Sequence, residues 1–308
     1  MSDLNPLNLV VVTGPTASGK TGFAARLAKM INGEIISADS RQVYRGMDLG
    51  TGKDYEDYQI DDTSIPYHLI DIMEPGTPYN VYSFQQDFIE TFGGILDRGR
   101  MPILCGGTGL YIEAVLKGYR LIEVPPNDTL RLRMQAMSDE ELTDELKSIQ
   151  KLHNKSDTDN RKRLMRALEI AYHYKENPPE DIPYPSINYK IIGIKFDRSI
   201  ERERITTRLK ERLDTGMIDE VKILIEKFGI ERMEYFGLEY KFLAWYLSGK
   251  ITYEQMFESL NTAIHQFAKR QMTWFRRMQK NGFEISWIDG SLEMDEKLLH
   301  AEKYLIRQ

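Results

Sequence analysis

Short apolar runs alternate with helical patterns over the first third of the chain. Four runs have the length and composition of buried strands: LNLVVVT (7–13), EIISADS (34–40), YHLIDIM (67–73) and MPILCGG (101–107). A helical pattern follows three of these runs. The helix after the first run extends to about Met30, the helix after the third run ends at Gly99, and the helix after the fourth run begins at Thr108. This βαβ alternation predicts a parallel sheet with helices on both faces and sites at the carboxyl ends of its strands.

The pattern changes after Gly118. Residues 126–176 are helical in pattern, polar and charge-rich, and the proline-rich stretch 177–186 follows them. YKIIGIKFD (189–197) is predicted to be a buried strand that returns to the sheet, and ISWID (285–289) is a candidate for a last short strand. We therefore expect a core domain at 1–118 and 189–308, and a helical insert at 119–188.

Composition is that of an ordinary globular chain. The 308 residues are 41% apolar and 29% charged, the N-terminus lacks the features of a signal peptide, and no apolar stretch approaches the roughly 18 residues of a membrane span. A cytoplasmic location is the expectation. The single Cys105 excludes an internal disulfide framework and is expected in the core, and the scattered histidines predict no zinc site.

The net charge of −6 argues weakly against nucleic acid as a partner, because neutralising phosphates requires clustered Lys and Arg. Local clustering matters more than the sum, however, and three stretches are locally basic: 160–166, 202–212 and 268–280. The charge pattern therefore leaves an RNA partner open.

The first helix is preceded by GPTASGKT, which matches the phosphate-binding pattern G-x-x-x-x-G-K-[ST] in the required place after a strand. Its residues are Gly14, Pro15, Thr16, Ala17, Ser18, Gly19, Lys20 and Thr21. Backbone N–H groups in such a loop bind anionic oxygens, Lys20 adds positive charge, and the Thr21 hydroxyl can ligate Mg²⁺. The loop suits a nucleotide such as ATP, or equally a diphosphate that is about to leave. The fold class predicted is thus a P-loop NTPase-like α/β fold with a helical insert domain.

Asp39 ends the second apolar run and begins a long polar loop, ADSRQVYRGMDLGTGKD. Its carboxylate suits Mg²⁺ binding, a turn cap beside Ser40 or a general base, and the residues alone do not decide among these. Long polar loops at strand ends are more often functional than not. Thr108, in the glycine-rich turn CGGTGLY, is well placed as the N-cap of the next helix.

Arginine rows occur in two predicted helices. Arg204, Arg208 and Arg212 recur at i, i+4 and i+8 beside an apolar stripe; they form either a solvated shoulder or a contact to a diphosphate, and the spacing does not choose. Arg163 and Arg166 lie one helical turn apart, as on a charged outer face. In AKRQMTWFRR the cations are compatible with RNA contact, whereas the aromatic residues are expected in the core.

Six stretches occur in one order along nearly the whole chain: GPTASGKT, ADSRQVYRGMDLGTGK, HLID, CGGTGLY, RLMRALE and AKRQMTWFRR. Together they resemble the bacterial tRNA dimethylallyltransferases, also called tRNA isopentenyltransferases. The resemblance implies that the P-loop holds the diphosphate of dimethylallyl diphosphate, with Mg²⁺ as cofactor. It also implies transfer of the dimethylallyl group to N6 of the adenosine 3′ of the anticodon, with loss of diphosphate.

The resemblance assigns roles to single residues. Asp39 matches the general base, Thr21 the residue that contacts diphosphate and metal, and Arg208 the arginine that contacts diphosphate; with Lys20 they form the expected catalytic set. The residues expected to contact tRNA are Asp39, Ser40, Arg41, Gln42, Thr108, Arg131, Lys162, Arg163, Leu164, Met165 and Arg166. The insert is expected to clamp the anticodon stem-loop of the tRNA, and a monomer is expected.

Two departures from the family pattern concern tRNA contact. Ile264-His265 stands where many members have Thr-Arg, and Glu239-Tyr240-Lys241 has Glu where members have Gly. Three rival functions stay open: a P-loop small-molecule kinase, an adenylate isopentenyltransferase that uses free nucleotide, and a non-catalytic RNA-binding module.

Overall fold

The computed structural model describes residues 6–149, 160–178 and 183–306. The chain divides into two compact units: a sheet-containing unit of residues 1–117 and 185–308, and a helical unit of residues 118–184. Parts of the predicted insert and of its proline-rich end lie outside the described residues. No helix in the described ranges is both long enough and apolar enough to cross a membrane.

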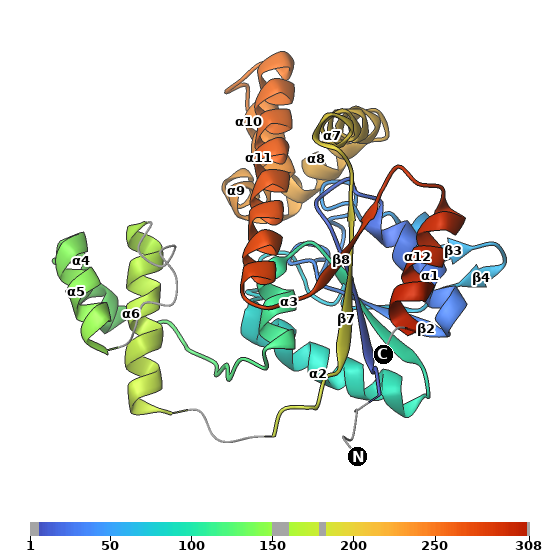
Figure 1. Ribbon diagram of the computed structural model, residues 1–308. Helices are drawn as coiled ribbons and strands as arrows, with labels where there is room; N and C mark the ends of the chain where they lie inside the picture. Colours follow the sequence, from blue (N-terminus) through green and yellow to red (C-terminus); the bar gives the residue numbers. More distant parts are fainter. Residues whose placement is uncertain (1–5, 150–159, 179–182, 307–308) are drawn as a thin grey trace. The chain divides into compact units, whose positions relative to one another are not determined.

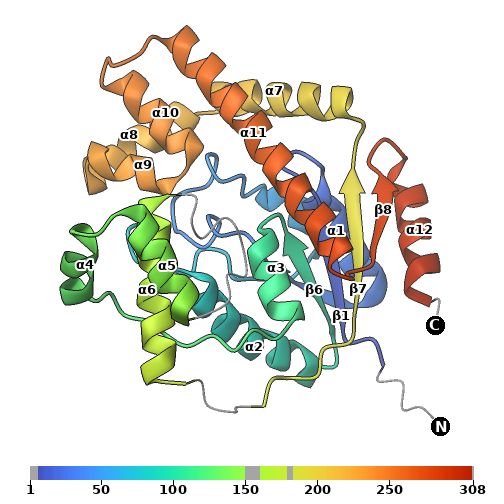
Figure 2. The same ribbon diagram turned by 60° about the vertical axis from the view of Figure 1, so that its left-hand side comes forward.

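Within the described residues, six parallel strands form the sheet, in the order β5-β2-β6-β1-β7-β8. Figure 1 shows β7 and β8 next to each other, and Figure 2 shows β6, β1, β7 and β8 across the sheet. Their bounds are β1 Leu9–Thr13, β2 Gly33–Ser37, β5 Tyr67–His68, β6 Met101–Gly106, β7 Tyr189–Lys195 and β8 Ile285–Asp289. The central strand β1 is buried throughout, and its Val11 pairs with Leu104 on one side and Ile191 on the other. Strands covered on both faces favour continuous apolar runs, which is why the sequence pattern found them. The predicted α/β fold with a parallel sheet is confirmed.

Helices cover both faces of the sheet because successive strand side chains point in opposite directions. On one face, Val11 and Leu104 pack with three helices; on the other, Val10 and Ile103 pack with two. The first group is α2 Val81–Asp97, α3 Gly109–Leu116 and α11 Tyr253–Lys280; the second is α1 Lys20–Ile31 and α12 Met294–Ile306. Helix α11 also crosses α3 (Figure 2).

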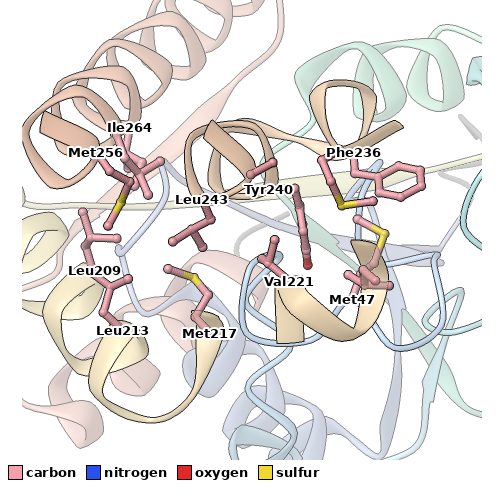
Figure 3. Close-up of a cluster of buried hydrophobic side chains, with 14 of the residues drawn as sticks. Met47, Leu209, Leu213, Met217, Val221, Phe236, Tyr240, Leu243, Met256 and Ile264 are labelled. Atoms are coloured by element: carbon pink, nitrogen blue, oxygen red, sulfur yellow. The ribbon is translucent and has the colours of Figure 1, made fainter. Parts of the chain in front are cut away.

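A helical lobe follows the carboxyl end of β7. It contains α7 Arg198–Asp214, α8 Met217–Phe228, the short helices η3 Ile230–Arg232 and α9 Met233–Phe236, α10 Leu238–Leu247 and the first half of α11. Its core joins Leu209, Met217, Leu243 and Met256, and Met47 from the loop after β2 packs into the same cluster (Figure 3). The apolar stripe predicted beside the arginine row is therefore buried, and this fixes the orientation of α7.

Three helices lie in the described part of the helical unit: α4 Asp128–Gln135, α5 Asp139–Ile149 and α6 Arg161–Glu176. Met134, Leu142, Leu146, Leu164 and Leu168 form its core and are each at most 1% exposed. This small core is separate from the clusters on the sheet, as expected for a unit with a fold of its own.

The strand predicted at 67–73 is wrong beyond its first two residues. Leu69 and Asp71 have φ of +60° and +56°, and only an isolated bridge from Met73 to Tyr44 continues the pairing. The reason is tertiary, because the partly exposed Asp71 carboxylate binds the buried ammonium group of Lys53. The helix η1 Tyr55–Tyr58 and the hairpin of β3 Gln59–Ile60 and β4 Thr63–Ser64 were not predicted either.

Candidate active site

A large cavity opens where β1, β2 and β6 end. Its volume is about 1140 Å³, and it is lined by residues 16–21, by residues 39–42, by the turn after β6 and by arginines of α7. All of these segments belong to the sheet-containing unit. The cavity thus brings together segments that the sequence pointed to separately, and it lies at the strand ends, where α/β sheets bind their ligands.

The P-loop (residues 14–21) joins β1 to α1. A Cβ on Gly14 would lie 2.4 Å from the carbonyl oxygen of Ile194, and Gly19 has φ of +73° immediately before the helix. The backbone therefore turns tightly and presents the first N–H groups of α1 to the cavity, an arrangement that binds anionic oxygens. Ser18 Oγ is buried without a hydrogen-bond partner among the described residues, which leaves this hydroxyl to a ligand.

Lys20 is the first residue of α1 and lines the cavity. Its Nζ donates a hydrogen bond to the carbonyl oxygen of Pro15, at 3.3 Å. Burial lowers the pKa of Lys20, and the negative charge of nearby Asp39 opposes that shift only in part. An anion bound in the loop would favour the charged ammonium and reverse part of this effect.

Gln271 of α11 braces the P-loop, a role that the sequence analysis missed. Its Oε1 accepts the N–H of Thr16 at 2.8 Å, and its Nε2 donates to the carbonyl oxygen of Gly107 at 3.1 Å. One buried amide thereby ties the loop after β1 to the turn after β6. The signal was available, because Gln271 interrupts the apolar face of α11 between Ala268 and Phe275.

Asp39 follows the end of β2 and borders the cavity. Its Oδ1 accepts the N–H of Arg41 at 2.9 Å, which closes an Asx-type turn. Within the described residues, no hydrogen bond occupies its second oxygen. Asp39 can therefore cap the turn and also take part in the reaction. One carboxylate oxygen holds the side chain in place, and the other is available to a ligand.

Thr108 stands at the N-cap position of α3, but its side chain makes no capping hydrogen bond, so the predicted capping role is wrong. Its Oγ1 instead accepts the N–H of Ser40 at 3.2 Å, because the loop after β2 places that donor beside it.

The side chain of Gln42 bridges its own loop, accepting from Ser37 Oγ and donating to the carbonyl oxygen of Gly52, each at 3.0 Å. The Arg41 guanidinium, at the cavity wall, donates to the carbonyl oxygen of Tyr235 at 2.7 Å.

A buried lysine organises the loop after β2. The side chain of Lys53 has no exposed surface; its Nζ donates to the carbonyl oxygen of Tyr44 at 2.6 Å and to Asp48 at 2.9 Å, and it also pairs with Asp71. Tyr55 donates its hydroxyl proton to the same Asp71. A buried charge with this many partners fixes the geometry around it.

A carboxylate from α8 holds the middle of the same loop. Glu220 accepts the N–H groups of Asp48, Leu49 and Gly50 at 3.0, 2.7 and 3.1 Å, and the hydroxyl of Tyr240 at 2.8 Å. A Cβ on Gly50 would lie 2.5 Å from the Tyr240 ring, so only glycine fits there. Tyr240, one of the residues in the family departure, is therefore a core residue that supports this loop.

The arginine row of α7 faces the cavity, which excludes the solvated-shoulder interpretation. Arg204 donates from Nε to the carbonyl oxygen of Ala17 in the P-loop, at 3.0 Å. Arg208 and Arg212 both pair with Asp54, the second of them at 3.1 Å. Each of the three lines the cavity.

The remaining predicted residues lie in the helical unit. Arg131 and Arg166 bind the two oxygens of Glu169 at 2.7 and 3.0 Å, which joins α4 to α6. Burial would raise the pKa of Glu169, but the hydrogen bonds from Arg131, the backbone of Asn127 and Arg166 outweigh it and lower that pKa.

Four predicted residues follow one another on α6. Lys162 and Arg163 lie on its exposed face, Met165 is partly buried, and Leu164 is 1% exposed. The Leu164 side chain therefore has almost no surface left for RNA.

The cavity residues fit a divalent cation held together with a diphosphate. Thr21 and the carboxylates of Asp39 and Asp54 line the cavity beside the P-loop. Among the described residues there is no cluster of three or more His, Cys, Asp or Glu side chains of the kind that holds a metal without other ligands. Mg²⁺ commonly takes one or two protein ligands and completes its shell with phosphate oxygens and water, which matches this donor set.

Comparison with known proteins gives one answer over nearly the whole chain. The sequence model of the family described as IPP transferase matches residues 42–278, and that described as isopentenyl transferase matches residues 7–65. A protein from Bacteroides fragilis named tRNA dimethylallyltransferase 2 is 57% identical, over 97% of this chain and 98% of its own. One from Parabacteroides distasonis named tRNA dimethylallyltransferase 1 is 53% identical over the same shares.

Solved structures agree with the sequence relatives. The tRNA isopentenylpyrophosphate transferase from Bacillus halodurans matches with a TM-score of 0.69 and 33% identity, over 97% of this chain and 95% of that one. A eukaryotic dimethylallyltransferase described as acting on tRNA matches with a TM-score of 0.73 at 20% identity, over 97% of this chain and 78% of that one. The second likeness concerns the fold alone.

Proposed function

The chain belongs to the IPP transferase family, and we propose that it transfers a dimethylallyl group from dimethylallyl diphosphate to N6 of the adenosine 3′ of the anticodon in tRNA. Diphosphate is the second product. The observation that carries the proposal is that the P-loop and the Asp39 carboxylate line one cavity. A site for an anionic leaving group thus lies beside a base for the acceptor.

The P-loop side of the cavity stabilises the leaving group. As the bond between the allylic carbon and the diphosphate oxygen breaks, its electron pair leaves with the diphosphate. The N–H groups at the start of α1, Lys20 and Arg208 line the part of the cavity where this negative charge grows. Stabilisation of such charge by groups already in place is commonly the largest catalytic contribution. The Ser18 hydroxyl is placed to donate a further hydrogen bond.

The acceptor side needs a base because the exocyclic amine of adenine is a poor nucleophile. N6 forms the new bond to the allylic carbon, and the proton that N6 loses passes to Asp39. The hydrogen bond from the N–H of Arg41 fixes the carboxylate for this step. Ser40, Arg41 and Gln42 continue along the cavity wall, where we expect the adenosine and its neighbours to lie.

Magnesium belongs to the proposal as a cofactor. When bound, Mg²⁺ would neutralise part of the charge on the diphosphate. The Thr21 hydroxyl is the protein group proposed to hold it, together with the diphosphate oxygens.

The target base must leave the anticodon-loop stack to reach the cavity, at a cost of about a few kcal/mol. We propose that the helical unit offsets this cost by clamping the anticodon stem-loop, with Thr108 in the sheet-containing unit and Arg131, Lys162, Arg163 and Arg166 in the helical unit contacting the RNA. Because a single chain supplies every residue invoked, the proposal needs only a monomer. We also propose that the protein acts in the cytoplasm.

The test is a transfer assay. Purified protein and Mg²⁺ are mixed with radiolabelled dimethylallyl diphosphate and, in separate tubes, unmodified tRNA or AMP. The proposal expects label in tRNA. Label in AMP alone would assign the protein to the adenylate isopentenyltransferases, and loss of the γ-phosphate from ATP without any transfer would support a kinase. Binding of tRNA without either reaction would indicate that the protein is a non-catalytic RNA-binding module.

A further inference from the structure

The three arginines spaced four residues apart on α7 make different contacts. Arg204 is bound to the P-loop backbone at Ala17, and its guanidinium lies 4.4 Å from the centre of the Phe196 ring. Arg208 and Arg212 instead lie side by side on the carboxylate of Asp54. The family resemblance gives a role to Arg208 only, so the position of Arg212 needs its own explanation.

The backbone of the loop after β2 is shaped around this arginine pair. A Cβ on Gly52 would lie 2.5 Å from Nη2 of Arg212 and 2.9 Å from Nη2 of Arg208, and Gly52 has φ of +74°. Any side chain at Gly52 would displace both guanidinium groups. The loop therefore leaves room for both guanidinium groups.

The charges around the pair favour an anionic ligand. The Arg212 side chain is 15% exposed and Arg208 is 29% exposed, so two like charges are largely removed from water beside Lys20. Burial and the neighbouring Arg208 lower the pKa of Arg212, while Asp54 opposes that shift. Asp54, which is 44% exposed, is the carboxylate that pairs directly with both arginines. Asp57 and Glu239 act on the arginines from nearby, and burial raises the pKa of each, which reduces their negative charge. A diphosphate carries enough charge for the whole group of cations.

The pair also adjoins the P-loop. A second, small cavity of about 20 Å³ is lined by Thr16, Ala17, Arg208, Arg212 and Glu239, together with apolar residues of the lobe. An anion held by the P-loop would thus lie beside both arginines. Burial raises the pKa of Glu239, which reduces the negative charge that it sets against such an anion.

We propose that Arg212 is a second diphosphate-binding arginine beside Arg208, and that Asp54 is a positioning residue that holds the two guanidinium groups side by side for the anion. The identity of the anion rests on the proposed function. A paired guanidinium clamp suits a diphosphate because each planar group can donate two hydrogen bonds to its oxygens.

The experiment measures binding of inorganic diphosphate with Mg²⁺ by calorimetry, so it needs no transfer activity. Arg212→Met is expected to weaken this binding by about 10- to 100-fold, and Arg212→Lys, which keeps the charge, by less. Arg202→Met is the matched control, because Arg202 lies exposed on the same helix and does not line the cavity. Circular dichroism and thermal unfolding establish that each variant is folded.

Two further readouts separate a ligand contact from a merely structural role. The KM for dimethylallyl diphosphate should rise in Arg212→Met while the affinity for tRNA stays within twofold. The losses in Arg208→Met and Arg212→Met should be non-additive in the double variant if both bind one anion. Diphosphate affinity within twofold of wild type in folded Arg212→Met would overturn the proposal.

The outcomes keep the two proposals apart. Diphosphate binding that depends on Arg212 in a protein without transfer activity would leave the anion site standing and refute the proposed function. Transfer to tRNA with normal diphosphate affinity in Arg212→Met would support the proposed function and refute the role of Arg212.

Discussion

Asp39→Asn tests the proposed chemistry with the least disturbance of the loop. Asparagine keeps an oxygen in place of Oδ1, so it can still accept the 2.9 Å hydrogen bond from the N–H of Arg41 and preserve the turn. The amide is not a base, so the proton on N6 loses its acceptor. General-base catalysis contributes about 10²–10⁴ in rate, which corresponds to about 2.7–5.4 kcal/mol of barrier. We expect kcat to fall by this factor, with KM for both substrates within a few-fold of wild type.

The assay is steady-state transfer of label to tRNA with each substrate varied in turn, and diphosphate and tRNA binding are measured separately. Asp39→Ala is the companion variant: it loses the base and the Asx turn together, so KM for tRNA should rise in addition to the fall in kcat. A kcat for Asp39→Asn within tenfold of wild type would show that the carboxylate is not the base. A fall in binding equal to the fall in kcat would give Asp39 a purely structural role.

Three further outcomes are expected. Glu220→Gln should lower the free energy of unfolding by about 1.5–3 kcal/mol in urea titrations, since charge-assisted hydrogen bonds to three N–H groups weaken, whereas the exposed Glu226→Gln on the same helix should change it by less than about 0.5 kcal/mol. The pKa of Glu34 is lowered, chiefly by the hydrogen bond from Arg98, so its stabilisation is present above its ordinary value of 4.5 and is lost as pH falls through the folded-state value. The stability difference between wild type and Glu34→Gln should therefore be constant near pH 7 and shrink below about pH 4.5. Arg163→Ala should weaken tRNA binding and reduce its salt slope by about one; an unchanged slope would return this residue to a solvated helix face.

The sheet could be predicted from the sequence because its strands are buried on both faces. The runs at β1 and β6 are apolar over nearly their whole length, and β7 has a buried apolar centre from Ile191 to Ile194. Nothing in the tertiary structure competes with that pattern. The run at 67–73 looked similar, yet the backbone turns away after His68 because Asp71 binds a buried lysine eighteen residues earlier in the chain. A hydrophobic pattern contains no information about such a distant partner.

Some features of the candidate site could likewise be predicted from local sequence, whereas others depend on tertiary packing. The glycine pattern of the P-loop and the position of Asp39 at a strand end are local features, and both segments line the cavity as their strand ends implied. Whether the α7 arginines face water or the cavity depends on the packing of the lobe, which the spacing cannot specify. The link between Thr108 and Ser40 depends on two loops that meet only in the fold.

The loop after β2 joins the two halves of the proposed reaction. At its start it bears the proposed base Asp39, and at its end Asp54 holds the arginine pair. Lys53 and Glu220 fix the segment between them, so a shift of that segment must move both ends together. Substitution of Lys53 should therefore alter KM for tRNA and for dimethylallyl diphosphate in parallel. This differs from the effect on kcat alone expected for Asp39→Asn and from the effect on the diphosphate substrate alone expected for Arg212→Met. The three patterns distinguish a residue that organises the site from one that takes a proton and one that binds an anion.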